Sequence, residues 1–513
     1  MRDTETVTDS TLPINLILPV PDTDFRDYLD EVDELVEFAP EIIGAIEQDL
    51  DTHARKKKLL RMKDRKFFES VTDDLPQLDI AEHNILADQL GLAVGRPRMS
   101  GYAVYLFLML RGFLGSLTSK TAQRFLRESM SLFAFLQMRE LKMPAWTTIL
   151  ENVNLVSHAT RELIFNRQIE FVLKEDLDDF RELTIDSTSV KANSRWPTDG
   201  KILNGILGRA HRLGQKLHVF GLKDFRKGWV PRWLDEMDKL EFQICLSAGK
   251  PKSRGKMKKH YRKLLSRGEK AGGALKCELD CLEEGLDMAT LPPSRRELLK
   301  RTLEQIRNDI ADAKRVVEYA GERVFKDRKL PSTEKVLSLS DGSAAYIKKG
   351  GRDPVIGYKP QLVRSRNGFV TSLIVPQGNA ADSIKLVPAI LDSIGRTGVI
   401  AELVSTDDGY ASAKGREDLQ DLGVKSISIS GAKGKKLTDP EDWSSEVYRD
   451  ARRNRSAVES LMFTIKDGFD FGELGRRGID AVRNELLEKV LAYNSCRIIL
   501  MKKRHREKLK QAA

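Results

Sequence analysis

Three acidic residues in separate stretches of the chain are of the type that binds catalytic metal ions. Asp186 follows the apolar run 183–185, Asp407 follows the apolar run 399–404, and Glu459 lies in a helix-forming stretch farther along. Carboxylates are the protein ligands that Mg²⁺ prefers, and a pair of divalent cations promotes in-line displacement at a phosphodiester. Together, the three residues predict a metal-dependent site for phosphodiester chemistry.

Different elements must position these three acids. The apolar runs before Asp186 and Asp407 predict buried strands that carry the acids at their carboxyl ends. At about 100° per residue, Arg455, Glu459 and Lys466 fall on one face of a helix. The site is therefore expected where two strand ends meet a helix.

Each acid also has a purely structural explanation. Asp186 before a serine could form an Asx turn, Asp408 before a glycine could belong to a tight turn, and Glu459 could form an ion pair on a solvated helix. For each residue alone that explanation is favoured, and only the joint placement favours a shared site. Asp408 is also an alternative to Asp407, because successive side chains at a strand end point to opposite faces. We take Asp407 as the working assignment.

Length and composition predict a folded protein of two or three units. The chain has 513 residues, 41% of them hydrophobic, and its N-terminus is acidic with no basic stretch leading into an apolar one. No apolar run is long enough for a membrane helix, so we expect no membrane partner and a cytoplasmic, nucleoid-associated location. Four cysteines in so long a chain argue against a disulfide framework.

The distribution of charge indicates a polyanionic partner. The net charge is +10, although residues 1–51 contain fifteen acids and only two basic residues. Basic residues gather in the runs 55–61, 250–263 and 497–510. Solvated helical faces explain any single run equally well, but three runs together favour binding to double-stranded DNA.

Periodicity and composition divide the chain into five parts. We expect an acidic, partly disordered arm (1–63), an all-α domain (64–178), an α/β catalytic core in two pieces (179–199 and 334–496), a helical, coiled-coil-like insertion (200–333) and a basic tail (497–513). Helices are predicted over 80–92, 102–114, 120–136 and 147–173, and the segments 119–125 and 143–148 would suit a helix-turn-helix, although plain helix packing explains them about as well. The insertion is expected to fold as an antiparallel helical hairpin with the run 250–263 at its turn.

Inside the core, strands and helices are expected in a definite order. The strand before Asp186 is followed by the insertion and then by strands over 335–339, 357–363 and 369–375, the last two joined by a hairpin turn at 365–368. Next come a helix over 381–394, the strand 399–404, a helix over 411–421, the strand 424–429 and the helix bearing Glu459. This order predicts a mixed sheet with crossover helices.

The order of elements and several short motifs resemble the DDE transposases of bacterial insertion sequences, most closely the ISNCY type, which have a ribonuclease H-like core. The resemblance covers roughly residues 100–500, and its motifs are weak one by one but specific in their order. They are Ile185–Asn193 leading into Trp196–Asp199, Gly350-Gly351 through Gly357–Lys359, Asp407-Asp408-Gly409-Tyr410, Arg455–Ser460, Lys466–Phe469 and Leu491–Asn494. Related families place a tyrosine three residues before the signature arginine, where this chain has Arg452.

The resemblance implies an activity and a role for each matching residue. Asp186, Asp407 and Glu459 would be the catalytic acids and would bind two Mg²⁺ or Mn²⁺ ions. Arg455 and Lys466 would contact DNA phosphates, with Lys191 and Arg195 as weaker candidates for the same task. The implied protein is a DNA transposase, a polynucleotidyl transferase and endonuclease that acts as a homo-oligomer on transposon ends and target DNA. Two alternatives stay open, namely an inactive or domesticated DNA-binding relative and a metal-dependent DNA nuclease on the same fold.

Overall fold

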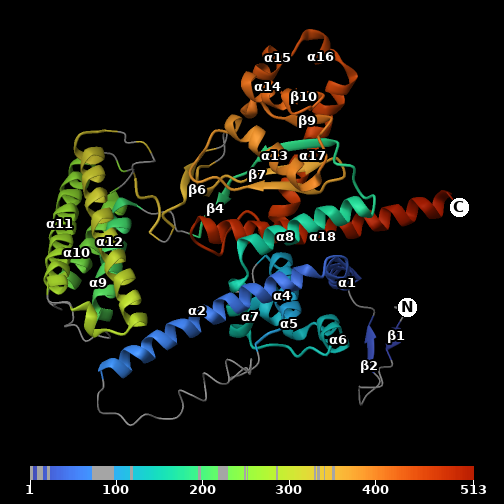
Figure 1. Cartoon of the computed structure of the whole chain (residues 1–513). Coiled ribbons are helices and arrows are strands. Elements are labelled where there is room, and N and C mark those ends of the chain that lie inside the picture. The colour runs from blue at the N-terminus through green and yellow to red at the C-terminus, as the bar shows by residue number, and fades with distance from the viewer. Residues whose placement is uncertain are drawn as a thin grey trace. The chain divides into compact units, whose positions relative to one another are not determined.

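The computed structural model divides the chain into two compact units (Figure 1). The first comprises Met1–His53, Arg96–Asn193 and Ile347–Ala513, and the second comprises Ala54–Gly95 and Ser194–Tyr346. The structure describes residues 4–7, 16–19, 23–71, 98–115, 120–193, 198–217, 229–247, 250, 252–284, 287–328, 331, 335–339, 341–348 and 353–512. The predicted helix 80–92 lies outside these residues.

The first unit contains a five-stranded mixed sheet of order β10-β9-β3-β7-β8. Strands β3, β9 and β10 run parallel, whereas β7 pairs antiparallel with both β3 and β8. The predicted mixed sheet is thus confirmed. Its strands are β3 (Glu182–Ser187), β7 (Gln361–Ser365), β8 (Val370–Ile374), β9 (Leu403–Thr406) and β10 (Ser426–Ile429). The turn between β7 and β8 is made by Gly368, whose φ of 97° suits glycine.

Helices cover the two faces of this sheet. On one face, α13 (Leu386–Thr397) and α14 (Ala413–Asp421) form a core with Leu183, Ile185 and Val404 of the strands. The helix α17 (Glu446–Gly468) contacts β3, β9 and β10. Its buried side chains are not members of that core among the described residues, which places α17 against the opposite face. Between β10 and α17 lie the short helices α15 (Ala432–Leu437) and α16 (Pro440–Ser444).

The rest of the first unit is mostly helical and packs around the C-terminal helix α18 (Ile479–Ala512), which runs beside α8 (Figure 1). Its other helices are α1 (Thr23–Phe38), α4 (Gly101–Phe113), α5 (Lys120–Glu128), α6 (Met130–Met138), α7 (Trp146–Leu155) and α8 (His158–Lys174). The sequence predicted two long helices where the structure has four. The breaks fall at Ser129 and Ser157, whose hydroxyls cap α6 and α8.

Both ends of the chain contain helices. The expected arm contains α1, whose Tyr28, Leu29 and Val32 are buried, together with the start of α2 (Glu41–Val71). A small antiparallel pair, β1 (Thr4–Val7) and β2 (Leu16–Pro19), precedes them. The expected basic tail is the last part of α18. The two ends meet, because Lys502 Nζ donates to the buried Glu31 Oε2 at 2.9 Å.

Among the described residues of the second unit, four helices pack around one apolar core. They are α9 (Asp199–Gln215), α10 (Val230–Ser247), α11 (Arg254–Glu284) and α12 (Pro293–Phe325). The predicted seam on α12 is buried at Leu299, Leu303 and Ile306, and a fully buried Asp309 follows it and binds Arg209. The basic run 250–263 begins at the turn between α10 and α11, as the helical-hairpin prediction placed it.

The segment that leads from α12 back to the sheet contains less strand than predicted. Residues 335–339 form no strand, and the first strand after α12 is β5 (Ala345–Ile347) at the boundary between the units. In the first unit, β6 (Val355–Tyr358) pairs antiparallel with β4 (Val190–Lys191). Within the described residues, no helix is long and apolar enough to cross a membrane.

One buried acid connects four segments of the first unit. Glu488 of α18 is 1% exposed and accepts from Arg161 of α8 at 2.7 Å and from Arg111 of α4 at 2.6 Å, and Arg476 before α18 also pairs with it. Burial alone would raise the pKa of Glu488, but the three guanidinium groups outweigh burial and hold this pKa well below its ordinary value. Burial lowers the pKa of Arg111 to about 10, which leaves it charged at neutral pH.

We predict that Glu488→Gln lowers the free energy of unfolding by about 3–5 kcal/mol, because it leaves the buried Arg111 and Arg161 and the partly buried Arg476 without their counter-charge. The matched control is Glu473→Gln, whose side chain is 78% exposed and pairs with Lys191, and its expected change is below about 1 kcal/mol. Because the folded-state pKa of Glu488 is depressed, its stabilisation is present above the ordinary value of 4.5 and is lost as the pH falls toward the folded-state pKa. Thermal unfolding from pH 7 to pH 3 measures both effects. Equal losses of unfolding free energy in Glu488→Gln and Glu473→Gln would contradict the stabilising role assigned to Glu488.

Candidate functional site

Asp186 and Asp407 stand side by side at the carboxyl ends of neighbouring parallel strands. The pairing of β3 with β9 sets Glu182 beside Leu403 and Thr184 beside Ser405, and the same register carried two residues farther sets Asp186 beside Asp407. The hydroxyls of Thr184 and Ser405 are 2.8 Å apart. Since side chains two residues apart in a strand share a face, the register directs both acids to the same face.

The structure distinguishes Asp407 from its alternative Asp408. Asp407 Oδ1 accepts from the Gly409 backbone N–H at 2.9 Å, which keeps its carboxylate at the strand end. Asp408 Oδ1 instead accepts from the backbone N–H groups of Lys433 and Gly434, at 2.8 and 2.9 Å. Those two donors belong to the first turn of α15, so Asp408 anchors that helix.

Glu459 is on the expected helix but is not joined to the two aspartates. Its side chain is 65% exposed, and its Oε1 accepts from Arg455 Nη2 at 3.2 Å, one turn earlier on α17. Across the part of the chain that the structure describes, no three His, Cys, Asp or Glu side chains are close enough to hold a metal ion together. The structure therefore brings together two of the three predicted acids.

The predicted phosphate-binding residues have different surroundings. Lys466 of α17 donates to the Ser189 carbonyl at 3.1 Å, just beyond the end of β3. Lys191 lies on β4 and forms an exposed ion pair with Glu473 at 3.3 Å. Arg455 contacts Glu459, and Arg195 lies outside the described residues. Lys466 is thus the predicted basic residue that the structure fixes next to the Asp186 strand.

Prediction from sequence missed an acid near these aspartates. Asp382, just before α13, accepts from Lys359 Nζ at 2.8 Å and from Gln361 Nε2 at 3.0 Å. Gln361 begins β7, directly opposite Ser187 of β3. Asp382 lies in a short polar segment between a strand and a helix, and no local pattern in the sequence sets it apart from other loop acids.

A buried tyrosine lies among the three aspartates. Tyr410 is fully buried, and its hydroxyl donates to Gln361 Oε1. Burial, and then the negative charges of Asp382, Asp186 and Asp407, raise the pKa of Tyr410 far above its ordinary value. The hydroxyl therefore stays protonated and acts as a hydrogen-bond donor at the site.

The donor set at the strand ends suits a divalent cation. A Cβ placed on Gly409 would lie 3.0 Å from Asp407 Oδ1 and 3.4 Å from Asp382 Oδ2, so glycine leaves a small space between the two carboxylate oxygens. Oxygen ligands around such a space suit Mg²⁺ or Mn²⁺. Asp186 shares the face of Asp407, and these two carboxylates are the candidates to hold a metal.

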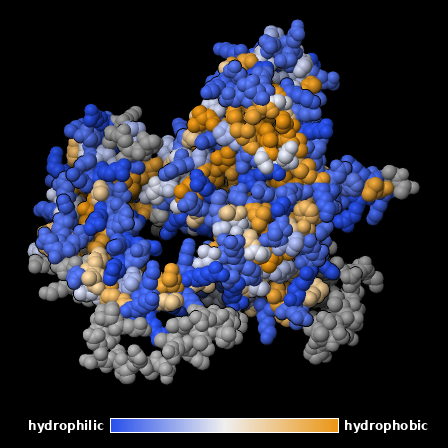
Figure 2. Space-filling model, viewed as in Figure 1, coloured by the Kyte–Doolittle hydropathy of each residue, from blue (hydrophilic) through white to orange (hydrophobic). Residues whose placement is uncertain are grey.

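The surface beside Glu459 is open and partly apolar. Figure 2 shows hydrophobic side chains gathered over the region of α13 and α17. Phe463, one turn after Glu459 on α17, is 71% exposed. The face of α17 that carries Glu459 is thus accessible to a partner.

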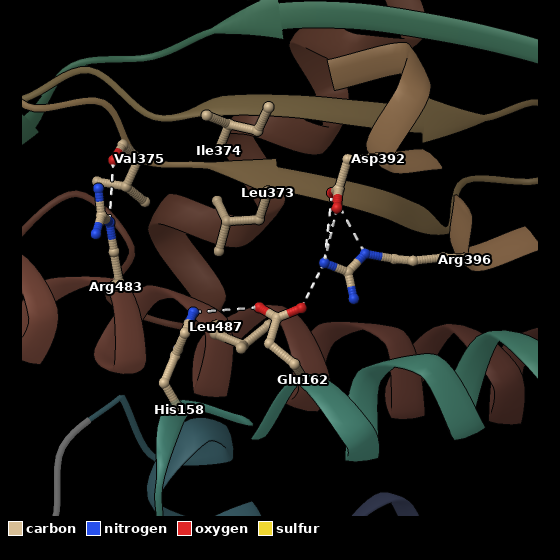
Figure 3. Close-up of a pocket in the computed structure, with 9 residues that line it drawn as sticks. All are labelled: His158, Glu162, Leu373, Ile374, Val375, Asp392, Arg396, Arg483 and Leu487. Atoms are coloured by element: carbon tan, nitrogen blue, oxygen red, sulfur yellow. Dashed lines mark hydrogen bonds and ion pairs between the residues drawn. The ribbon is translucent and has the colours of Figure 1, made fainter. Parts of the chain in front are cut away.

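A separate cavity of about 350 Å³ lies between α8, β8, α13 and α18. Figure 3 shows Arg396 turned toward both Asp392 and Glu162, with His158 also facing Glu162. The floor is apolar, with Leu373 of β8 and Leu487 of α18. At this cavity Arg396 pairs with both Asp392 and Glu162, and none of the predicted site residues lines it.

Comparison with known proteins identifies the region that contains most of the site. Residues 325–495 match the family model described as "Transposase DDE domain". The match includes Asp407, Asp382 and Glu459, and Asp186 lies upstream of it. No curated protein and no solved structure matches the chain.

We predict different effects on stability for the two adjacent aspartates. Asp408→Ala removes the acceptor for the first turn of α15 and should lower the free energy of unfolding by about 1 kcal/mol. Asp407→Asn keeps the acceptor for Gly409 and removes a charge near Asp186 and Asp382, so stability should stay equal or rise. Chemical denaturation at neutral pH measures both, and a larger loss in Asp407→Asn would contradict the two assignments.

Proposed function

We propose that this chain, whose C-terminal half carries a transposase DDE domain, binds the ends of an insertion sequence and cleaves and joins DNA there. The observation that carries the proposal is the parallel register of β3 and β9, in which Thr184 pairs with Ser405, because Asp186 and Asp407 each follow two residues farther along. The mixed sheet with α17 on the face of these acids supports a ribonuclease H-like core. The sequence motifs favour the ISNCY type.

The proposed reaction is an in-line displacement at phosphorus, first by water and then by the freed 3′-hydroxyl. When bound, a pair of Mg²⁺ or Mn²⁺ ions would activate the attacking oxygen and stabilise the leaving one. Asp186, Asp407 and Glu459 would hold them. No covalent intermediate with the protein is needed, because the attacking groups come from water and DNA.

Glu459 must change its partner for this site to be complete. In the structure it accepts from Arg455 on an exposed face of α17. In the proposed working arrangement, Glu459 turns toward the two aspartates, and Arg455 exchanges its carboxylate for a DNA phosphate. A guanidinium group suits both partners, because each presents oxygens to its paired donors. Lys466, held beside the end of β3, would position a second phosphate.

The second unit supports DNA binding by concentrating positive charge at one end of its helices. The start of α11 meets the end of α12, since Arg254 pairs with Asp327 at 2.5 Å and Arg262 lies over Phe325. On α11, Lys256, Lys259 and Lys263 are exposed on one outward face. Lys256 lies in the first turn of α11, where a cation opposes the helix dipole, so helix stability does not explain its position.

The proposed activity predicts that Asp186→Asn, Asp407→Asn and Glu459→Gln each lower cleavage by about a hundredfold or more, because each removes a ligand charge needed in the transition state. The substrate is duplex DNA from the borders of the element with Mg²⁺ or Mn²⁺, and products are resolved on denaturing gels. DNA affinity should stay within about threefold of wild type. Asp392→Asn, an acid paired with Arg396 away from the site, is the matched control.

The outcomes of this assay distinguish the related functions. Joined products in the wild type support a transposase, whereas cleavage without joining indicates a nuclease on this fold. Binding without metal-dependent turnover indicates an inactive DNA-binding relative. Cleavage that persists in all three variants would show that the site is elsewhere.

DNA binding through the second unit predicts a change in salt dependence. Replacing Lys256, Lys259 and Lys263 with glutamine should weaken binding to any duplex and reduce the slope of log K against log salt by about one for each lost phosphate contact. The control replaces Lys276, Lys300 and Lys314, three exposed lysines elsewhere on α11 and α12, and should leave the slope unchanged. Fluorescence anisotropy at salt concentrations from roughly 50 to 300 mM measures DNA affinity and its salt dependence in both triple variants. Equal slopes in the two triple variants would contradict this role.

A further inference from the structure

The second half of α2 contains a helical segment with no buried face. α2 is one continuous helix (Figure 1), and its residues 54–71 belong to the second unit. Its first half buries Ile46 and Leu50, whereas every residue of the segment 54–63 is exposed. Even the apolar Leu59 of this segment is 53% exposed. The segment is therefore not the solvated side of a packed helix, because no side of it is packed.

The charged side chains of this segment are all positive. Residues 54–63 contain six cations and no acid, and we call this stretch the basic segment. Its cations are Arg55, Lys56, Lys57, Lys58, Arg61 and Lys63. At about 100° per residue, the four consecutive cations 55–58 are distributed around the whole helix. The basic segment thus presents positive charge on all its sides.

The amino-acid content of the basic segment explains why it is helical but not why its charges share one sign. Lysine, arginine, leucine and alanine are strong helix formers. Like charges three or four residues apart, such as Arg55 with Lys58 and Lys57 with Arg61, destabilise a helix, whereas glutamate and lysine at this spacing stabilise it. A helix that served only as a spacer would gain from mixed charges. The uniform charge therefore indicates a negatively charged partner.

The acids that precede the basic segment do not neutralise it, because they have partners in the first unit. Glu47 and Asp51 both pair with Arg98. Glu34 of α1 pairs with Lys502. Among the described residues, no ion pair is formed by five of the six cations, namely Arg55, Lys56, Lys57, Arg61 and Lys63. Most of the charge of the basic segment is thus left for a partner molecule.

Duplex DNA is the polyanion whose shape fits a helix with cations on all sides. The major groove is about 12 Å wide and admits an α-helix, which has about that diameter with its side chains. Phosphates line both walls of the groove, so a helix that lies in it meets negative charge on both sides. Continuous basic helices are known to bind in the major groove in this manner. An acidic polypeptide beside the helix would neutralise one side and leave the other uncompensated.

We propose that the basic segment of α2 binds duplex DNA by lying in the major groove, with its cations on the phosphates of both walls. Displacement of counterions from these phosphates drives the binding. The inference rests on the proposed function, because that function makes DNA the partner, and it adds the element that holds the DNA. It does not depend on the three acids of the candidate site.

The first test is hydrogen–deuterium exchange of the full chain, without metal, alone and with a saturating DNA duplex of mixed sequence. Amides of residues 54–63 should exchange quickly in the free protein, because no tertiary contact protects them, and about tenfold or more slowly with the duplex. Single-stranded DNA and poly-glutamate serve as comparison ligands. Equal protection by either of these, or no protection by the duplex, would overturn the inference.

The second test replaces Lys56, Lys57 and Arg61 with glutamine. Duplex affinity should fall about tenfold or more, and guanine N7 atoms, which face the major groove, should lose protection from dimethyl sulfate. Without DNA, the free energy of unfolding should stay equal or rise, because the change relieves repulsion between like charges.

The matched control is the triple variant of exposed lysines elsewhere on α11 and α12, which should keep both the affinity and the guanine protection of the wild type. Equal affinities in the two triple variants would overturn the inference. A loss of stability in the free K56Q/K57Q/R61Q protein would do so as well, because it would show that these cations have a structural role.

The same proteins are assayed for DNA cleavage, so that the two proposals can fail separately. Duplex-specific protection of residues 54–63 without cleavage by the wild type would sustain this inference and refute the proposed catalysis. Cleavage by the wild type with unchanged exchange at residues 54–63 would sustain the proposed function and refute this inference.

Discussion

The parallel pairing of β3 with β9 is the constraint on which the candidate site depends. Hydrogen bonds between the two strands fix their register, and a slip by one residue would turn one aspartate to the other face of the sheet. The Thr184–Ser405 contact secures this register from the buried side, and the Asp408 contact with α15 secures the loop that follows β9. Two side chains more than 200 positions apart in sequence are held together mainly by backbone geometry.

Local sequence patterns predicted those parts of the site that depend on local structure. Asp186 and Asp407 end apolar runs, and such runs form buried strands whose carboxyl ends meet at one edge of a sheet, so their approach followed from the strand prediction. The placement of Glu459 and Lys466 on one helix followed in the same way from helical periodicity. The partner of Glu459 could not be predicted from periodicity, because an exposed carboxylate can turn toward Arg455 or toward the sheet without any change in the helix.

Features that depend on distant contacts were not predictable. Asp382 gains its significance from Lys359, Gln361 and Gly409, and none of these neighbours forms a motif with it. In the N-terminal segment, α1 buries an apolar stripe, and the contact of its Glu31 with Lys502 near the other end of the chain joins positions that no local pattern connects. Single polar residues also changed the helix count, since Ser129 and Ser157 end runs that periodicity alone would continue.

The chain departs for the second unit just after β4 and returns just before β6. Lys191 of β4, just before the departure, is paired with Gly357 of β6, just after the return. The two ends of the excursion are therefore neighbours in one ladder, and closing the loop costs little more for a long excursion than for a short one. The four helices between them bury their own core. Relatives of this chain could thus shorten, enlarge or exchange that module while the aspartate-bearing strands keep their geometry, which makes this junction a natural point for diversification and for engineered fusions.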